Sequence, residues 1–250
     1  MRGGYLPWAG KRGGWGETDR HMRPWKRGGP WGLLWAGAAG ALLVSGCRLN
    51  PRSEEGDVRV RLINAVPDAA GLDVSVDGQR VWRRAPFRSN TGYQGIAAGS
   101  YPLSVSGGGL GETLSARSLA FEKGHEYTVL ALGAGPGGGA QVQVFQDDAE
   151  RRAEGGKAVV RLINAGVGLA PIDLVVNNIV GLKNVAYGKR SRTLLLDPGA
   201  YDLKVALADS PDPVAGPVTL RLEPGRTYTL AAMGRASDGS LSLEAYPDAR

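Results

Sequence analysis

The chain has 250 residues, with 30 Lys and Arg, 24 Asp and Glu, and a formal net charge of +6 at pH 7. Residues 1–46 hold seven of the basic and two of the acidic residues, a net of +5, so residues 47–250 carry +6 minus +5, or +1. Nucleic-acid binding needs a basic face that releases counterions, and this nearly neutral body argues against a nucleic-acid partner. The single cysteine excludes an intramolecular disulfide.

The N-terminal part has the three parts of an export signal. Residues 31–46 form an uncharged run of sixteen residues, which follows three basic residues and precedes Cys47. A basic region, a short apolar region and small residues before a break are typical of a signal peptide. The run is shorter than the ~20 residues that span a bilayer. The alternatives are an uncleaved anchor and a buried apolar segment with an inert cysteine.

The end of this run, Val44-Ser45-Gly46-Cys47, resembles the lipobox of bacterial lipoproteins. The resemblance implies cleavage between Gly46 and Cys47 and lipidation of the Cys47 thiol. Several acyl chains, at ~0.8 kcal/mol per buried CH₂, would hold the protein on a membrane essentially permanently. Arg48 instead of Asp after the cysteine resembles the sorting pattern of outer-membrane lipoproteins, so we expect the outer membrane in a cell with two membranes.

Two segments therefore precede the folded part. Residues 1–46 are the predicted signal peptide, and Met22 is the expected start because residues 1–21 are rich in Gly and Trp and contain acidic residues. Residues 47–57 combine the cysteine with Arg, Glu, Pro and Asn without periodicity, which predicts a short flexible tether.

Beyond residue 57 the pattern has period two, which predicts β-strands. In the first strand Val60 and Leu62 share one face, and Arg61 is expected on a solvent-facing side. Asp77-Gly78 predicts a hairpin turn, and Asn177-Asn178 can adopt the same turn. We predict strands at 58–64, 74–76, 91–96, 101–105, 113–121, 126–132 and 141–145, and again at 159–164, 172–176, 179–185, 192–196, 201–206, 218–222, 227–233 and 241–246.

The chain contains an internal repeat. The pentapeptide RLINA at 61–65 recurs at 161–165, and the flanking residues keep the same register. Such self-similarity indicates duplication, and short strands separated by Gly, Pro, Asn and Asp are typical of a sandwich. We therefore predict an all-β chain of two tandem immunoglobulin-like antiparallel β-sandwich domains, at 58–147 and 158–250, joined by a linker at 148–157.

Both copies also keep a tyrosine beside each of two glycine turns. These are Tyr101 and Tyr127 in the first copy, and Tyr201 and Tyr228 in the second. Such rings could stack on sugars, but packing with the hydroxyl bonded to backbone is the favoured interpretation.

These motifs together resemble a known family. R-x-I-N-A, V-P-D-A, L-D-V-S-V-D-G, A-A-G-S-Y and E-K-G-H-E-Y-T-V in residues 58–147 resemble the DUF4397 domain, which occurs in bacterial extracytoplasmic proteins. The second copy is looser, because Gly166-Val167-Gly168-Leu169 replaces V-P-D-A. The tandem is also similar, more weakly, to the accessory proteins of alginate O-acetylation. The resemblance implies a β-sandwich outside the cytoplasm and brings no catalytic residue.

The residue inventory argues against an enzyme. His125 is the only histidine after Cys47, so a Ser-His-Asp triad or a multi-histidine metal site cannot be assembled without it. Asp73 and Asp173 could be a pair of catalytic acids, but the favoured interpretation is that each caps backbone donors. We expect no cofactor and no metal.

One surface feature points to binding. The segment between the third and fourth strands is basic in both copies and contains aromatic residues, which would suit an anionic glycan or phosphate. The alternative is a solvated edge that prevents sheet aggregation. The candidate binding residues are Trp82, Arg83, Arg84, Phe87, Arg88 and Tyr93 in the first copy, and Lys183, Tyr187, Lys189, Arg190 and Arg192 in the second.

The sequence thus predicts a non-catalytic lipoprotein of the cell envelope, anchored through lipid on Cys47. Its expected partners are an anionic polysaccharide or another envelope protein. The alternative function is an accessory subunit of an exopolysaccharide modification or O-acetylation complex.

Overall fold

The computed structural model describes residues 56–67, 69–108, 114–134, 140–148, 154–210 and 212–248. The predicted signal peptide, the cleavage site at Gly46 and Cys47, and the tether up to residue 55 lie outside these ranges. The described residues form strands and a short 3-10 turn, η2 (Glu154–Gly156), and contain no α-helix. In this part of the chain no helix is long and apolar enough to cross a membrane.

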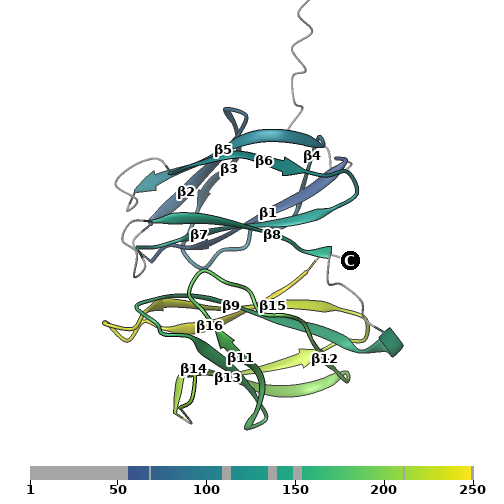
Figure 1. Ribbon diagram of the computed structural model, residues 1–250, viewed down its shortest axis with the longest axis vertical. Helices are drawn as coiled ribbons and strands as arrows, with labels where there is room; N and C mark the ends of the chain where they lie inside the picture. Colours follow the sequence, from purple (N-terminus) through teal and green to yellow (C-terminus); the bar gives the residue numbers. More distant parts are fainter. Residues whose placement is uncertain are drawn as a thin grey trace, which may run out of the picture. The chain divides into compact units, whose positions relative to one another are not determined.

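The first repeat has eight strands in two four-stranded sheets (Figure 1). One sheet has the order β4-β1-β7-β8 and the other the order β3-β2-β5-β6. The strands are β1 (Val58–Ala65), β2 (Gly71–Val76), β3 (Gln79–Ala85), β4 (Gln94–Ile96), β5 (Gly99–Gly108), β6 (Leu114–Phe121), β7 (Glu126–Leu132) and β8 (Gln141–Gln146).

The second repeat reproduces this topology strand for strand. Its sheets have the orders β12-β9-β15-β16 and β11-β10-β13-β14. The strands are β9 (Ala158–Val167), β10 (Ile172–Val176), β11 (Ile179–Val185), β12 (Leu194–Leu196), β13 (Gly199–Leu207), β14 (Pro213–Leu222), β15 (Thr227–Arg235) and β16 (Ser242–Pro247). The duplication that the sequence predicts is therefore present in the fold.

Strand pairing is antiparallel, as predicted, with one exception in each repeat. β1 lies parallel to β7, and β9 lies parallel to β15. In this register Arg61 lies beside Thr128, and Arg161 lies beside Thr229. The parallel pair thus sets two polar residues side by side in the middle of each sheet.

The two predicted hairpin turns are confirmed. Asp77 and Gly78 have φ of 52° and 72°, and Asn177 and Asn178 have φ of 45° and 67°. A two-residue type I′ turn requires positive φ at both central positions, and Asp, Asn and Gly tolerate it best.

The fourth strand of each repeat is shorter than predicted. Residue 91 does not begin β4, because the hydroxyl of Thr91 accepts the backbone N–H of Leu62 at 2.9 Å. Ser191 accepts the N–H of Leu162 at 2.9 Å in the same way. A side-chain hydroxyl therefore takes the place of a backbone carbonyl as the acceptor, and the segment beside β1 or β9 is a loop at this point.

The predicted role of the repeated tyrosines is confirmed. Each hydroxyl is bonded to backbone within its own turn, and the rings of Phe121 and Tyr127 pack edge to face at 5.2 Å between centroids. The bonds are Tyr101 to Ala98 O (3.1 Å), Glu122 N to Tyr127 (3.1 Å), Tyr201 to Asp197 O (2.9 Å) and Glu223 N to Tyr228 (3.0 Å).

The described residues form two intrasandwich cores and a third core between the repeats. Each sandwich encloses its own apolar cluster between its two sheets. The third cluster lies where β1 and β7 meet β9 and β15, and we call this contact the seam. Its buried apolar members are Ile63, Ala65, Leu130, Leu132, Ile163, Ala165, Ala231 and Met233.

The seam covers the face of β1 that was expected to meet solvent. Val60 and Leu62 point into the first sandwich, while Ile63 points into the seam. Arg61 is 0% exposed, as is Arg161 in the second copy. The expectation of a solvent-facing Arg61 is therefore wrong, because the second repeat takes the place of solvent.

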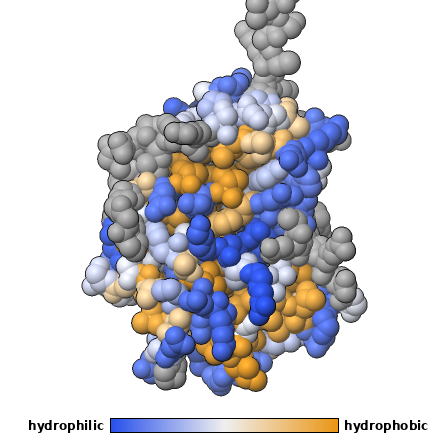
Figure 2. All heavy atoms as spheres, in the orientation of Figure 1, coloured by the Kyte–Doolittle hydropathy of each residue, from blue (hydrophilic) through white to orange (hydrophobic). Residues whose placement is uncertain are grey.

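Apolar side chains also reach the surface, where they lie among hydrophilic ones (Figure 2). Among the described residues the most exposed large ones are Ile179 (73%), Val180 (42%) and Leu195 (41%). All three belong to β11 and β12 of the second repeat.

Replacing Leu130 by Ala tests how much packing in the seam contributes to the stability of the fold. Leu130 is 0% exposed and belongs to the cluster between the repeats, so Leu130→Ala should lower the free energy of unfolding by about 2–5 kcal/mol. Denaturant unfolding measures this. Leu195→Ala, at an exposed position, should change it by less than about 0.5 kcal/mol. Equal effects of the two substitutions would contradict a packed seam.

Candidate functional site

The seam contains a cluster of charged and hydroxyl side chains built from equivalent positions of the two repeats. The arginines come from the RLINA strands, the threonines from the parallel partner strands, and the aspartates from the residue after the last strand of each repeat. The members are Arg61, Thr128 and Asp147 in the first repeat, and Arg161, Thr229 and Asp248 in the second, all at most 2% exposed.

Strand register brings each arginine to its own threonine. Arg61 Nε donates to Thr128 Oγ1 at 2.7 Å, and Arg161 Nε donates to Thr229 Oγ1 at 3.0 Å. These contacts follow from the parallel pairing of β1 with β7 and of β9 with β15. They orient each guanidinium toward the seam.

The other ends of the two guanidinium groups cross to the opposite repeat. Arg61 Nη2 lies 2.8 Å from Asp248 Oδ1, and Arg161 Nη2 lies 2.9 Å from Asp147 Oδ1. The contacts are reciprocal, as in the isologous interface of a twofold dimer. A buried charge is tolerated when a paired and hydrogen-bonded partner replaces water. Here each arginine has such a partner in the other copy, and Arg161 also bonds Asp248 of its own copy.

Asp147 is the most heavily bonded acid of the cluster. Its Oδ2 accepts the hydroxyls of Tyr93 at 2.7 Å and Thr128 at 2.5 Å, and its Oδ1 accepts Arg190 Nη1 at 3.1 Å as well as Arg161. Burial, followed by the charge of Asp147, holds the pKa of Tyr93 far above its ordinary value. Tyr93 is therefore a neutral donor to this carboxylate.

Arg61 is the one member with an unsatisfied donor. Its Nη1 has no hydrogen-bond partner among the residues that the structure describes. The guanidinium lies over the Tyr93 ring instead, with 4.8 Å from Cζ to the ring centroid, a favourable cation–π distance. Burial acts against the charged form of Arg61, but the negative groups around it, Asp248 first, outweigh burial and keep its pKa raised.

The structure separates the predicted binding residues into three groups. The first is Trp82, which is 4% exposed and part of the core of the first sandwich. It lies opposite Val74 on β2, whose side chain also faces that core. The interpretation of Trp82 as an exposed aromatic residue is therefore wrong.

The second group points into or along the seam. Arg88 Nη2 donates to Ser240 O at 2.7 Å, and the Tyr187 hydroxyl donates to Gly133 O at 2.8 Å. Both bonds join one repeat to the other, which leaves these side chains engaged inside the protein. The group consists of Phe87, Arg88, Tyr93, Tyr187 and Arg190.

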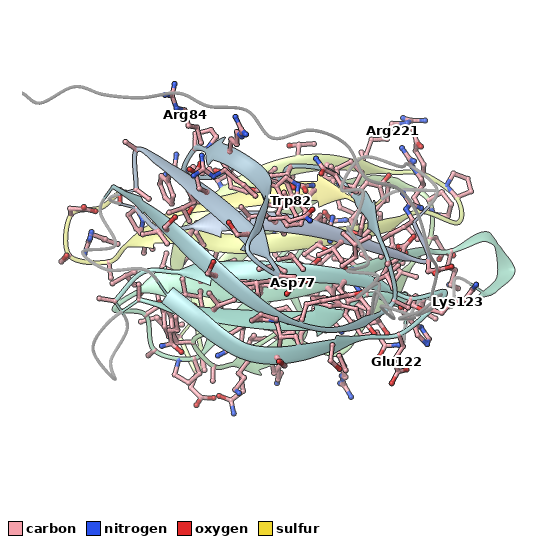
Figure 3. All side chains as sticks on the ribbon, turned by 90° about the horizontal axis from the view of Figure 1, so that it is seen from above. Asp77, Trp82, Arg84, Glu122, Lys123 and Arg221 are labelled. Atoms are coloured by element: carbon pink, nitrogen blue, oxygen red, sulfur yellow. The ribbon has the colours of Figure 1, made fainter. Side chains whose placement is uncertain are left out.

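The third group remains exposed and consists of Arg83, Arg84, Lys183, Lys189 and Arg192. Figure 3 shows Arg84 projecting away from the ribbon, whereas Trp82 lies against the body of the sandwich. Only this group can meet a ligand without opening the structure.

An irregularity in strand register in each repeat carries Arg84 and its counterpart Asn184. Arg84 has φ of 48°, and its N–H donates to Asp73 Oδ1 at 2.8 Å. In the second repeat Asn184 has φ of 58° and donates to Asp173 Oδ1 at 2.7 Å. The predicted role of the two aspartates as acceptors of backbone donors is confirmed, with the donor on the neighbouring strand. Irregularities of this kind re-aim side chains.

The exposed cations of the second repeat surround a hollow. It has a volume of about 400 Å³ and is lined by residues 182–186 and 189–192. Lys183, Lys189 and Arg192 belong to this lining, and Arg190 closes it on the side of the seam. No aspartate or glutamate is among the lining residues.

His125 lies at the edge of the first sandwich, in an acidic setting. Its Nδ1 is 2.6 Å from Asp148 Oδ2, and its Nε2 is 3.6 Å from Glu122 Oε2. The hydrogen bond to Asp148 raises the pKa of His125 above its ordinary value. Among the described residues no group of three His, Cys, Asp or Glu could hold a metal ion.

The sequence matches the DUF4397 family, described as a domain of unknown function, over residues 58–166 and 158–250. No curated protein matches the chain. A solved structure from Bacteroides ovatus, provisionally described as a cell adhesion protein, is 9% identical, with 79% of this chain and 98% of that chain covered and a TM-score of 0.23. At this TM-score the likeness carries no argument.

Asp147→Asn tests the buried cluster. The substitution removes a carboxylate charge that pairs with Arg161 and Arg190. It leaves Asp248 to pair with both Arg61 and Arg161, so it should lower the free energy of unfolding by about 3–5 kcal/mol. Denaturant unfolding measures the loss. Asp197→Asn removes the exposed partner of Lys157, which lies 2.8 Å away, and should change stability by less than about 1 kcal/mol. A similarly small effect of Asp147→Asn would contradict a stabilising role of the buried cluster.

The His125–Asp148 pair predicts a pH dependence. Because the folded pKa is raised, the pair stabilises the fold fully below the ordinary pKa of ~6.5, and this contribution is lost as the pH rises through the folded pKa. In Asp148→Asn the pKa of His125, followed by NMR titration, should fall toward its ordinary value. Asp238→Asn should leave it unchanged. An unaltered titration in Asp148→Asn would contradict the contact.

Proposed function

The chain belongs to the DUF4397 family, and we propose that it is a non-catalytic binding and scaffolding protein of the bacterial cell envelope. In this proposal the two repeats are immunoglobulin-like sandwiches, and the chain is exported and held on the membrane by lipid on Cys47. Its partner is an anionic glycan or another envelope protein.

The observation that carries the proposal is the division of the charged residues between the seam and the surface. The buried arginines and aspartates bond one another across the repeats and within the second repeat. They have no access to solvent, so they suit a structural lock better than chemistry on a substrate. The exposed group of the candidate residues is cationic, with Lys183, Lys189 and Arg192 around one hollow. A local group of exposed cations on a folded body suits the binding of an anionic partner.

The lipid anchor fits the position of the first strand. β1 begins at Val58, shortly after the cysteine in sequence. Val58 lies 11 residues after Cys47 (58 minus 47), and a chain of this length reaches at most roughly 40 Å when extended, so a lipid on Cys47 would keep the first sandwich close to the bilayer. Partners at or near a membrane surface are therefore favoured.

The second candidate function is an accessory subunit of an exopolysaccharide modification or O-acetylation complex. It rests on the resemblance of the tandem to such accessory proteins. A lock that fixes two sandwiches relative to one another would also serve a subunit that positions an enzyme.

Cys47→Ser tests the anchor. In cells labelled with radioactive palmitate, the wild-type chain should carry label and fractionate with membranes, and the variant should do neither because serine cannot form the thioether. Ser53→Ala, six residues along the same tether (53 minus 47), is the matched control and should behave as wild type. Label that survives in Cys47→Ser would overturn the proposed anchor.

A further inference from the structure

Resting on the proposed binding function, we propose that the hollow of the second repeat is the binding site for an anionic polysaccharide. Lys183, Lys189 and Arg192 bind its oxyanions, and the equivalent region of the first repeat does not provide such a site.

The charge of the hollow is available to a ligand. Among the residues that the structure describes, none forms an ion pair with Lys183, Lys189 or Arg192, and all three are exposed. The lining contains no acid that could neutralise them. Like charges gathered without a counterion repel one another, and an anion placed among them relieves that repulsion.

Lys183 lies on β11, and the loop that carries Lys189 and Arg192 is held by hydrogen bonds to Asn164. Asn164, the asparagine of RLINA, donates its N–H to Lys189 O at 3.1 Å and accepts the N–H of Gly188 at 2.8 Å. Its side-chain Nδ2 donates to Val185 O at 3.0 Å. A preorganised site loses less conformational entropy on binding, so the fixed backbone of this loop favours affinity.

Arg190 ties the same loop to the first repeat. Its Nη2 donates to Gln146 O at 3.0 Å, and its Nη1 lies 3.1 Å from Asp147 Oδ1. Its guanidinium also lies over the Phe145 ring, 5.1 Å from the centroid. Arg190 is therefore a positioning residue that fixes one wall, and the hollow depends on the closed seam.

Comparison of the two copies makes the site specific to the second. Lys189, Arg190 and Arg192 stand where the first copy has Ser89, Asn90 and Gly92. The loops follow the same path, because each forms an isolated antiparallel β-bridge with its RLINA strand, Asn90 with Ile63 and Arg190 with Ile163. The backbone path is thus shared by the copies. Both copies are basic at residue 83 or 183, but the other basic side chains stand at 84 and 88 in the first copy and at 189, 190 and 192 in the second.

The dimensions and chemistry favour a charged sugar unit. A volume of about 400 Å³ lies within the range of small-molecule sites. Leu182 and Val185 supply apolar lining, while Asn184 is an exposed amide at the rim. Three separated cations suit a polymer with repeated carboxylates or sulfates better than a single ion.

The test is equilibrium binding with the full-length protein, purified in detergent from whichever cell fraction contains it. The probes are two matched pairs, dextran sulfate with dextran and polygalacturonate with its methyl ester, together with phosphatidylglycerol vesicles. The site variant is Lys183→Ala/Lys189→Ala/Arg192→Ala. The control variant Arg80→Ala/Lys123→Ala/Arg221→Ala removes the same charge from exposed positions outside the candidate binding residues.

We expect wild type to bind at least one charged polymer and neither neutral one, with affinity that falls as salt is raised. The site variant should bind roughly tenfold or more weakly, and the control variant should bind within about twofold of wild type. Circular dichroism and the unfolding midpoint of the site variant should match wild type, because the replaced side chains are exposed.

Each other outcome has a defined meaning. Equal binding by the site variant and wild type would overturn the site while leaving the proposed binding function standing. Binding to vesicles alone would replace the polysaccharide by a lipid headgroup and overturn this inference. Wild type that binds none of the probes would overturn the site and the glycan part of the proposed function, whereas the anchor on Cys47 is decided separately by palmitate labelling.

Discussion

The fold depends on two ion pairs that cross from one copy of a duplicated sandwich to the other. Arg61 and Arg161 lie in the same position of the same strand, and each reaches the terminal aspartate of the opposite repeat. Arg161 also bonds Asp248 of its own repeat, and Arg61 Nε lies 3.8 Å from Asp147 of its own repeat. Each buried arginine is therefore surrounded by carboxylates from both copies. The two copies thus supply each other's counterions, and the apolar residues around the pairs exclude water and strengthen them.

This arrangement has the reciprocity of a homodimer within one chain. The bonds need not be equivalent in strength, because the copies have diverged around them. Asp147 accepts Tyr93 and Arg190 in addition to Arg161, and the tyrosine hydroxyls that cross the seam use different acceptors on the two sides. The surrounding side chains therefore differ between the copies, whereas the pairs Arg61–Asp248 and Arg161–Asp147 are formed by equivalent residues.

The two copies also differ in the exposed side chains of one loop, although its backbone is held in the same way in both. The asparagine of RLINA holds the loop after β11, and that loop carries Lys189 and Arg192 of the hollow. In the first copy the equivalent loop is held by the same type of bonds, to Arg88 and Ser89, but its basic residue Arg88 is bonded across the seam to Ser240 O, and positions 89, 90 and 92 are not basic. A repeated backbone frame leaves the side chains of one copy free to acquire a function that the other does not need.

The sequence by itself determined the duplication, most of the strand positions, the positive-φ turns at Asp77 and Asn177, and the acceptor role of Asp73, because each follows from local pattern or from comparison of the copies. It did not predict β3 (Gln79–Ala85) of the first repeat. It misplaced Arg61 and Trp82. Both errors have one physical reason, which is that the type of a side chain does not show what covers it. The second repeat covers Arg61, and the core of the first sandwich encloses Trp82. Tertiary structure decided which faces are covered, since the partners of a buried arginine lie in the other repeat. It also showed which of the predicted basic residues are bonded within the seam and which remain available to a ligand.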